Sequence, residues 1–317
     1  MTETTPEQSQ PPEPQRFQVH RAQVRDGLEL AYIREGEGGY PLLLLHGWPE
    51  TKRIWWRNIE PLARAGFEVI VPDLRGFGDS GLAPDGFYDQ VAVAGDLHAL
   101  VHDLLGHERC ATAGGDWGGV VAQELGLRYE GFVERQCLFN TVLPLLKDEY
   151  AAAGLKPPPR SERLATSDYF IRQGRDADAL TAELDTPQRR LRYISQFYGP
   201  RLWGAPGSFG EDEIAFMSEP FADADKLRAS FGLYEVATGN RAPSEMPRFF
   251  ETNPVPTLVF YGPEDHVIWK DFPERSEVVF SERIGPLIVP RAGHFLQWER
   301  ADLLNQSLIY FFADLRG

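Results

Sequence analysis

The chain has 317 residues, of which 42% are hydrophobic and 25% charged, enough apolar material for the large core of a soluble enzyme. The formal net charge is −15, from 32 basic and 47 acidic residues without a block of like charges, which disfavours nucleic acid and anionic membranes as partners. The two cysteines, Cys110 and Cys137, supply neither a disulfide framework nor a metal cluster, so we expect a cytoplasmic protein without a metal.

Residues 1–16 are polar and rich in proline, and we expect a disordered tail there rather than a signal peptide or an anchor. From residue 17 onward, apolar runs alternate with helical patterns. The expected strands are 17–24, 28–33, 41–45, 67–72, one that starts at 110, 134–140, 256–262 and 285–290. The expected helices are 54–65, 90–105, 120–127 and 303–315. This alternation predicts an α/β fold, a mainly parallel sheet with helices on both faces.

The rhythm changes between residues 141 and 248, where apolar strand runs disappear and helical charge patterns with scattered aromatic residues replace them. We therefore divide the chain into a core, residues 17–140 and 249–317, and an inserted helical cap, residues 141–248. The cap is expected over the C-terminal ends of the strands, where open α/β sheets bind their ligands.

The most informative stretch follows Cys110 and contains an aspartate between glycines, Gly114-Gly115-Asp116-Trp117-Gly118. Small residues on both sides of one side chain permit the strained strand-to-helix turn that exposes a nucleophile, the pattern G-x-Nuc-x-G. A helix N-terminus also stabilises a carboxylate at this position. The alternative interpretation is an ordinary helix-capping aspartate in a glycine-rich turn.

Asp265 and His294 follow two later predicted strands, so Asp116, Asp265 and His294 stand in the order nucleophile, acid, histidine. That chain order is typical of hydrolases with this kind of elbow. His294 follows Ala292 and Gly293 in a loop, unlike a structural histidine of the core. The competing candidates are His266 for the histidine, and Glu264 and Asp271 for the acid.

The loop after residue 45, His46-Gly-Trp-Pro-Glu50, is expected to place the Trp48 N–H near the nucleophile, with His46 as a loop organiser rather than a base. Together with the Trp117 N–H, it would form an oxyanion hole. A carboxylate nucleophile attacks sp³ carbon, displaces a leaving group and forms an ester, which a histidine-activated water then cleaves. Epoxides and alkyl halides are the substrates that suit this chemistry.

A second glycine pattern, Gly76-x-Gly78-x-x-Gly81, resembles a dinucleotide-binding motif. Such a site needs a helix that opens on the glycines, whereas residues 82–86 continue as a loop. We expect no cofactor.

These motifs together resemble the α/β-hydrolase-fold epoxide hydrolases, with haloalkane dehalogenases as close relatives. The resemblance covers nearly everything after the tail. The matching segments are His46-Gly-Trp-Pro-Glu50, the loop at 73–80, Gly115-Asp-Trp-Gly-Gly119, Asn140-Thr141 at the start of the cap, and Gly293-His-Phe-Leu-Gln-Trp-Glu299. Family members often carry histidine just before the nucleophile, where this chain has Gly115, a departure that concerns elbow packing.

The resemblance implies two cap tyrosines that donate hydrogen bonds to the epoxide oxygen. Tyr169, in Ser-Asp-Tyr-Phe, is similar to the first family position, and Tyr234, in Phe-Gly-Leu-Tyr-Glu, to the second. The alternative is that both only pack within the cap. Trp48 stands where many dehalogenases have an asparagine that binds halide, which favours the epoxide.

The sequence thus favours an epoxide hydrolase that acts on a small-molecule epoxide without cofactor or metal. Asp116 is the expected nucleophile, His294 the base and Asp265 its orienting acid. The first alternative is a haloalkane dehalogenase with the same nucleophile, and the second is a non-catalytic small-molecule receptor. The oligomeric state, including a homodimer, is left open.

Overall fold

The structure, a computed structural model, describes residues 13–156, 168–201 and 203–316. One sheet of eight strands runs through it in the order β1-β2-β4-β3-β5-β6-β7-β8. The strands are β1 (Val19–Gln23), β2 (Glu29–Glu35), β3 (Tyr40–Leu45), β4 (Phe67–Pro72), β5 (Cys110–Gly115), β6 (Val133–Phe139), β7 (Thr257–Tyr261) and β8 (Arg283–Ile288). Two pairs are antiparallel, β1 with β2 and β2 with β4, and the remaining pairs, from β4 to β8, are parallel.

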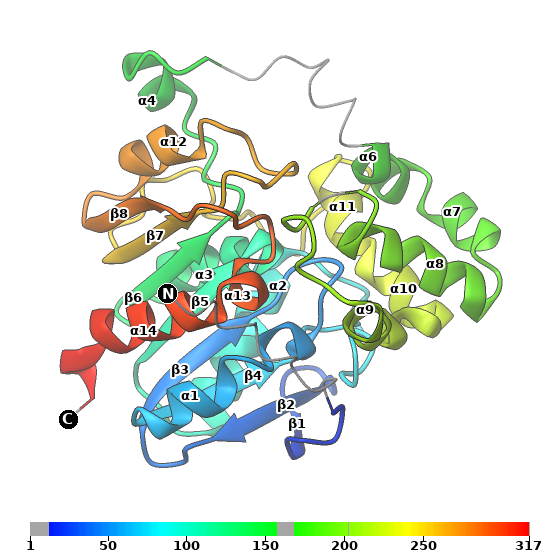
Figure 1. Cartoon of the computed structure of the whole chain (residues 1–317), viewed down its shortest axis with the longest axis horizontal. Helices are drawn as coiled ribbons and strands as arrows, with labels where there is room; N and C mark the ends of the chain where they lie inside the picture. The colour runs from blue at the N-terminus through cyan, green and yellow to red at the C-terminus, as the bar shows by residue number, and fades with distance from the viewer. Residues whose placement is uncertain (1–12, 157–167, 202, 317) are drawn as a thin grey trace, which may run out of the picture.

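The first half of the core contains η1 (Lys52–Trp55), α1 (Ile59–Arg64), α2 (Gln90–His98), the π-helical η2 (Ala99–Leu104) and α3 (Asp116–Arg128). After β7 follow α12 (Phe272–Val279), α13 (Leu296–Glu299), α14 (Ala301–Phe311) and η4 (Ala313–Leu315). In Figure 1, α1 and α14 lie in front of the sheet, and α2 and α3 lie behind it. The predicted parallel sheet with helices on both faces is confirmed.

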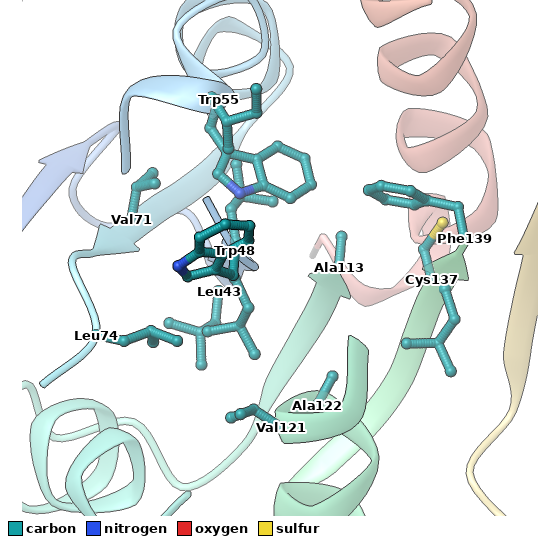
Figure 2. Packing of buried hydrophobic residues seen from close by; sticks show 14 of the residues in the cluster. Leu43, Trp48, Trp55, Val71, Leu74, Ala113, Val121, Ala122, Cys137 and Phe139 are labelled. Carbon is teal, nitrogen blue, oxygen red and sulfur yellow. The ribbon is translucent and has the colours of Figure 1, made fainter. Parts of the chain in front are cut away.

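The central strands are buried on both faces, as their continuous apolar runs predict. Leu43 of β3 lies opposite Ile70 of β4 and Thr112 of β5, and all of β4 and β5 is buried. Figure 2 shows Leu43, Ala113 and Cys137 of neighbouring strands packed with Trp55 and with side chains of α3. This core fixes the C-terminal ends of β3, β5, β6 and β7 relative to one another.

Between β6 and β7, the described residues form helices and turns without a regular strand. The helices are α4 (Lys147–Ala152), α6 (Asp168–Arg175), α7 (Ala177–Glu183), α8 (Pro187–Tyr198), α9 (Glu211–Ser218), η3 (Glu219–Ala222), α10 (Ala224–Ser230) and α11 (Gly232–Ala237). Figure 1 shows α6 to α11 grouped beside the C-terminal ends of the strands.

One predicted helix is wrong as a single element. Residues 54–65 were expected to be continuous, but η1 ends at Trp55 and α1 begins at Ile59. Pro61 explains the break, because proline lacks an N–H and fits only the first turn of a helix. The helix predicted over 90–105 is confirmed in extent, although its second half is π-helical. The elbow helix begins earlier than residue 120, at Asp116 itself.

Most of the expected N-terminal tail, residues 1–12, lies outside the described residues. Within the rest of it, the Glu13 carbonyl accepts a hydrogen bond from Trp56 Nε1 at 3.0 Å. Across the described ranges, no helix is both long and apolar enough to cross a bilayer.

Candidate active site

The turn between β5 and α3 is tight enough to require its glycines. Asp116 has a φ of 45°, in the left-handed region that a residue with a side chain seldom adopts. A Cβ on Gly114 would lie 2.7 Å from the Gly118 backbone, and a Cβ on Gly118 would lie 2.3 Å from the Leu45 carbonyl oxygen. These contacts force Asp116 out of the turn, the geometry of a nucleophile elbow.

The departure at Gly115 has a structural counterpart. A Cβ at this position would lie 2.4 Å from the ring of Phe139, which fills the space beside the elbow. Phe139 is fully buried in the core at the end of β6. The glycine and the phenylalanine are therefore complementary, and the elbow keeps its shape without a larger residue before Asp116.

The loop after β3 approaches the elbow closely and holds one carboxylate oxygen of Asp116. The Trp48 N–H donates to Asp116 Oδ1 at 2.8 Å, and the Asp116 side chain is largely buried. Trp117 follows Asp116 at the start of α3, where the first N–H groups of a helix have no acceptor within the helix itself. Both amides thus border Asp116, and only that of Trp48 bonds to it.

The structure brings the three residues of the expected triad into one buried chain. His294 Nδ1 lies 2.8 Å from Asp265 Oδ2, and His294 Nε2 lies 3.2 Å from Asp116 Oδ2. The N–H groups of Val267 and Ile268 donate to the other oxygen of Asp265, at 2.6 and 3.1 Å. Asp265 is therefore fixed as the acceptor that orients the imidazole.

The competing residues lie elsewhere. His266 is exposed to solvent, and Asp271 accepts hydrogen bonds from Arg275 at the start of α12. Glu264 is only half-buried, with its N–H bonded to the Ala292 carbonyl. No hydrogen bond or ion pair within the described ranges joins any of these three to Asp116 or His294.

The charges around His294 decide its protonation. Burial alone lowers the pKa of this imidazole, but the carboxylates of Asp265 and Asp116 oppose burial and raise the pKa well above its usual range. Two carboxylates therefore flank the imidazole of His294 and favour its protonated form.

His46 has the opposite character, as expected for a loop organiser. Its Nε2 accepts a hydrogen bond from the Leu74 N–H at 3.0 Å, and its Nδ1 lies 2.9 Å from the Gly47 carbonyl oxygen. Burial lowers the pKa of His46 to about 4, so the ring is neutral and joins two loops.

Tyr169 and Tyr234 face Asp116 from α6 and α11. Both are buried, their ring centroids lie 5.8 Å apart, and both rings pack against Trp48. Burial raises the pKa of each hydroxyl well above its usual value, and the negative charge of Asp116 adds to the effect. Both phenols are therefore protonated donors at neutral pH.

The other tyrosines of the inserted helical segment are already engaged. The Tyr150 hydroxyl donates to the Pro144 carbonyl at 2.7 Å, that of Tyr198 donates to the Pro49 carbonyl, and that of Tyr193 accepts from Gln173 at 2.9 Å. By contrast, the hydroxyl of Tyr234 has no hydrogen-bond partner among the described residues. Tyr234 thus retains a donor for a ligand.

A cavity of about 550 Å³ opens above these groups. Asp116, Trp117, Tyr169 and Tyr234 form its reactive end, while the rest of the wall is mainly apolar. Residues from the inserted helical segment and from the loop after β7 line it, for example Leu143, Leu155, Phe170 and Ile268. The cavity suits a small apolar molecule with one polar group directed at Asp116.

Glu50 belongs to the motif after residue 45 but was not predicted to have a role. This carboxylate is buried and accepts hydrogen bonds from the Gly47 N–H at 2.6 Å and from Gln297 Nε2 at 3.0 Å. Burial and the nearby charge of Asp116 raise the pKa of Glu50 to about 7. An acid beside an otherwise apolar strand end was the signal in the sequence.

One group within the described ranges has the composition of a metal site. The ligand atoms of His98, His102 and Asp103 lie within 4.8 Å of one another. His98 stacks on Tyr129 beyond the C-terminal end of α3, whereas Asp116 begins that helix. The group is therefore remote from the triad, and the reaction chemistry is assigned without it.

Comparison with known proteins agrees with this geometry. Residues 40–301 match the family described as the alpha/beta hydrolase fold. The chain is 30% identical over 306 residues to the soluble epoxide hydrolase of Corynebacterium sp. (strain C12), a match that covers 94% of this chain and 98% of that protein. It is 28% identical over 321 residues to epoxide hydrolase A of Mycobacterium tuberculosis, covering 92% and 96% of the two chains.

Among solved structures, the epoxide hydrolase CorEH without ligand matches with a TM-score of 0.80 and 28% identity, over 95% of this chain and 100% of that chain. The elbow, the buried triad and these matches define an α/β hydrolase. The chain belongs to the α/β-hydrolase fold family and, within it, to the group that includes these epoxide hydrolases, as its motifs predict.

Proposed function

We propose that this protein is an epoxide hydrolase that converts an epoxide into a vicinal diol through a covalent ester on Asp116. One observation carries the proposal: a buried Asp–His–Asp chain lies below an apolar cavity, and the hydroxyl of Tyr234 in its wall has no protein partner among the described residues. The similarity to known epoxide hydrolases supports the same substrate class.

In the first step, Asp116 Oδ2 attacks one epoxide carbon while the Trp48 N–H holds Oδ1. The C–O bond of the ring breaks, and its oxygen takes a proton from Tyr169 or Tyr234. This transfer matters because the leaving oxygen would otherwise become a strongly basic alkoxide. The products of the step are a hydroxyalkyl ester and a tyrosinate.

Ester formation also favours the neutral imidazole of His294, which is the base in the second step. It removes the Asp116 charge, which contributes to the raised pKa of His294, so that pKa falls once the ester exists. The proton released in this change can return to the tyrosinate. The neutral imidazole, oriented by Asp265, is then able to accept a proton from water.

In the second step, that water attacks the ester carbonyl carbon of Asp116, and negative charge develops on Oδ1. The Trp48 N–H already lies 2.8 Å from this oxygen, and the Trp117 N–H is the second donor of the proposed oxyanion hole. The tetrahedral intermediate expels the diol oxygen, which takes the proton that His294 received from water. The carboxylic acid left on Asp116 then gives its proton to His294, so the Asp116 carboxylate is regenerated with one oxygen from water.

We assign residues 17–140 and 249–317 to the core and residues 141–248 to a helical cap. Tyr169 and Tyr234 reach Asp116 from helices of this segment, and several of its side chains line the cavity. In this arrangement the cap supplies the acids, and the core supplies the nucleophile and the base.

A haloalkane dehalogenase is the alternative function for the same nucleophile. The indole N–H of Trp48, which could stabilise a halide, instead donates to Ser230 Oγ at 3.1 Å. The two buried tyrosines are stronger donors than a halide requires. A non-catalytic receptor has no need of the triad, and we therefore favour the epoxide.

A substrate panel tests the proposal. Styrene-type, aliphatic and fatty epoxides are compared with chlorinated and brominated alkanes, and Asp116→Ala serves as the control. We expect diol from at least one epoxide class, no turnover by the variant, and little or no halide release. Halide release without diol formation would assign the protein to the dehalogenases, and turnover by Asp116→Ala would reject Asp116 as the nucleophile.

A further inference from the structure

The carboxylate of Glu299, at the end of α13, accepts four hydrogen bonds from two distant parts of the chain. Two come from the histidine loop: the Gly293 N–H at 2.8 Å and the Phe295 N–H at 2.9 Å. The other two come from the inserted helical segment: the Ala205 N–H at 2.9 Å and Ser208 Oγ at 3.1 Å. The carboxylate thus joins the residues on both sides of His294 to the segment that follows α8.

The segment 203–208, which we call the strap, also contacts the histidine loop directly. The His294 N–H donates to the Trp203 carbonyl at 2.8 Å, and the Trp203 ring lies 5.1 Å from the imidazole. A Cβ on Gly293 would lie only 2.5 Å from the Ala205 nitrogen and 2.6 Å from the Trp203 carbonyl oxygen. Strap and loop therefore meet backbone to backbone, with no space for a side chain.

The three successive N–H groups of residues 293–295 donate outside the regular hydrogen-bond pattern of a strand or a helix. Glu299 accepts the first and third, and the Trp203 carbonyl accepts the second. Arg291, at the start of the loop, has a left-handed φ of 59°. The backbone conformation of the loop therefore depends on hydrogen-bond acceptors outside it, and Glu299 accepts two of the three bonds.

We propose that Glu299 is a positioning residue for the hydrolytic step: it holds the 293–295 loop against the strap so that His294 Nε2 stays over Asp116. The inference rests on the function proposed above and adds a residue to it. Glu299 is not among the residues that line the cavity. Since only the ester hydrolysis uses His294 as a base, Glu299 should affect hydrolysis and not alkylation.

The test is Glu299→Gln in the full chain, with Glu124→Gln as the matched control. Three donors converge on Oε2 of Glu299, and the Phe295 N–H donates to Oε1. If the glutamine places its amide oxygen at the position of Oε2, its amide NH₂ group faces the Phe295 N–H, and two donors then oppose each other. Glu124 is also a carboxylate that accepts from an arginine and from a backbone N–H, but it lies along α3 and away from the histidine loop.

Rapid-mixing kinetics with an accepted epoxide separate alkylation from hydrolysis. We expect Glu299→Gln to slow hydrolysis by about ten-fold to a hundred-fold, since a small displacement of a catalytic group has effects of that size. Alkylation should stay within about three-fold of the parent, because it depends on Asp116 and the tyrosines. The ester should therefore accumulate, whereas Glu124→Gln should lower the melting temperature without changing the ratio of the two rates.

A substrate-free readout keeps this test separate from the proposed function. His294 Nδ1 lies 2.8 Å from Asp265 Oδ2, so we expect the proton between them to give a downfield ¹H NMR signal. This signal should broaden or shift in Glu299→Gln and persist in Glu124→Gln. An unchanged signal with an unchanged ratio of rates would overturn the role of Glu299. If the parent formed no ester with any epoxide, the function would fail, while the NMR comparison would still decide whether Glu299 positions His294.

Discussion

Loss of a single hydroxyl in Tyr234→Phe should impair the chemistry without loss of stability. The Tyr234 hydroxyl is buried without a hydrogen-bond partner among the described residues, and its ring packs against Trp48 and Trp117 at 5.5 and 5.7 Å. Removal of a buried polar group without a hydrogen bond also removes its desolvation penalty, which is about 1–3 kcal/mol. For a chain of this length that corresponds to a melting temperature that is unchanged or higher by about 2–4 °C.

The same change removes one of two donors to the departing epoxide oxygen. Loss of such a donor costs about 3 kcal/mol of transition-state stabilisation, or roughly a hundred-fold in rate. Tyr169→Phe should behave similarly, and the double variant should be nearly inactive. Stopped-flow tryptophan fluorescence measures the alkylation step, because Trp48 and Trp117 adjoin Asp116.

Tyr193→Phe is the matched control, since its hydroxyl accepts from Gln173 at 2.9 Å. That variant should be less stable by about 1 kcal/mol, the usual value of one hydrogen bond, and should alkylate at the parent rate. If Tyr169→Phe and Tyr234→Phe both alkylate as fast as the parent, the two tyrosines only pack and do not act as acids.

Three further changes examine the other groups of the site. His294→Gln should be alkylated but should not release product, so intact mass spectrometry should show one substrate added per chain; an unmodified chain would argue against His294 as the hydrolytic base. Asp265→Asn removes a negative charge that raises the pKa of His294. The acid limb of the pH profile for hydrolysis should therefore move to lower pH, and the rate should fall. An acid limb at the same pH as in the parent would contradict the pairing of Asp265 with His294. The pKa of Glu50 is about 7 in the folded protein against an ordinary 4.5, so the folded state binds this proton more tightly than the unfolded state does. As the pH rises from about 4.5 to about 7, the protein therefore loses up to about 3 kcal/mol of its free energy of unfolding. Glu50→Gln should flatten this pH dependence of chemical denaturation, and an equal slope in both proteins would refute the assignment.

The sequence predicts those features whose cause is local. Asp116 could be recognised because the turn has no room for a Cβ at Gly114 and Gly118. This steric requirement is visible in the sequence as glycine at both positions. The order of strands and helices follows from apolar runs of strand length. The proximity of Asp116, Asp265 and His294 follows from the rule that parallel strands end at the same edge of a sheet.

Features with a non-local cause were not predicted. Glu50 and Glu299 derive their roles from donors on distant segments, Gln297 for the first and the strap for the second. A choice among the five tyrosines of the inserted helical segment depends on tertiary packing, so Tyr169 and Tyr234 were selected by resemblance alone. Pro61 was a local signal that the interpretation of residues 54–65 overlooked.

Isotope labelling tests the central claim, the covalent ester on Asp116, most directly. A single turnover of an accepted epoxide is run in ¹⁸O-water with enzyme in excess, and the peptide that contains Asp116 is analysed by mass spectrometry. Because water attacks the carbonyl carbon of the aspartyl ester, the label should enter the Asp116 carboxylate and the first diol should remain unlabelled. Label that appears entirely in the first diol, with an unlabelled peptide, would show direct attack of water on the epoxide and would contradict the account.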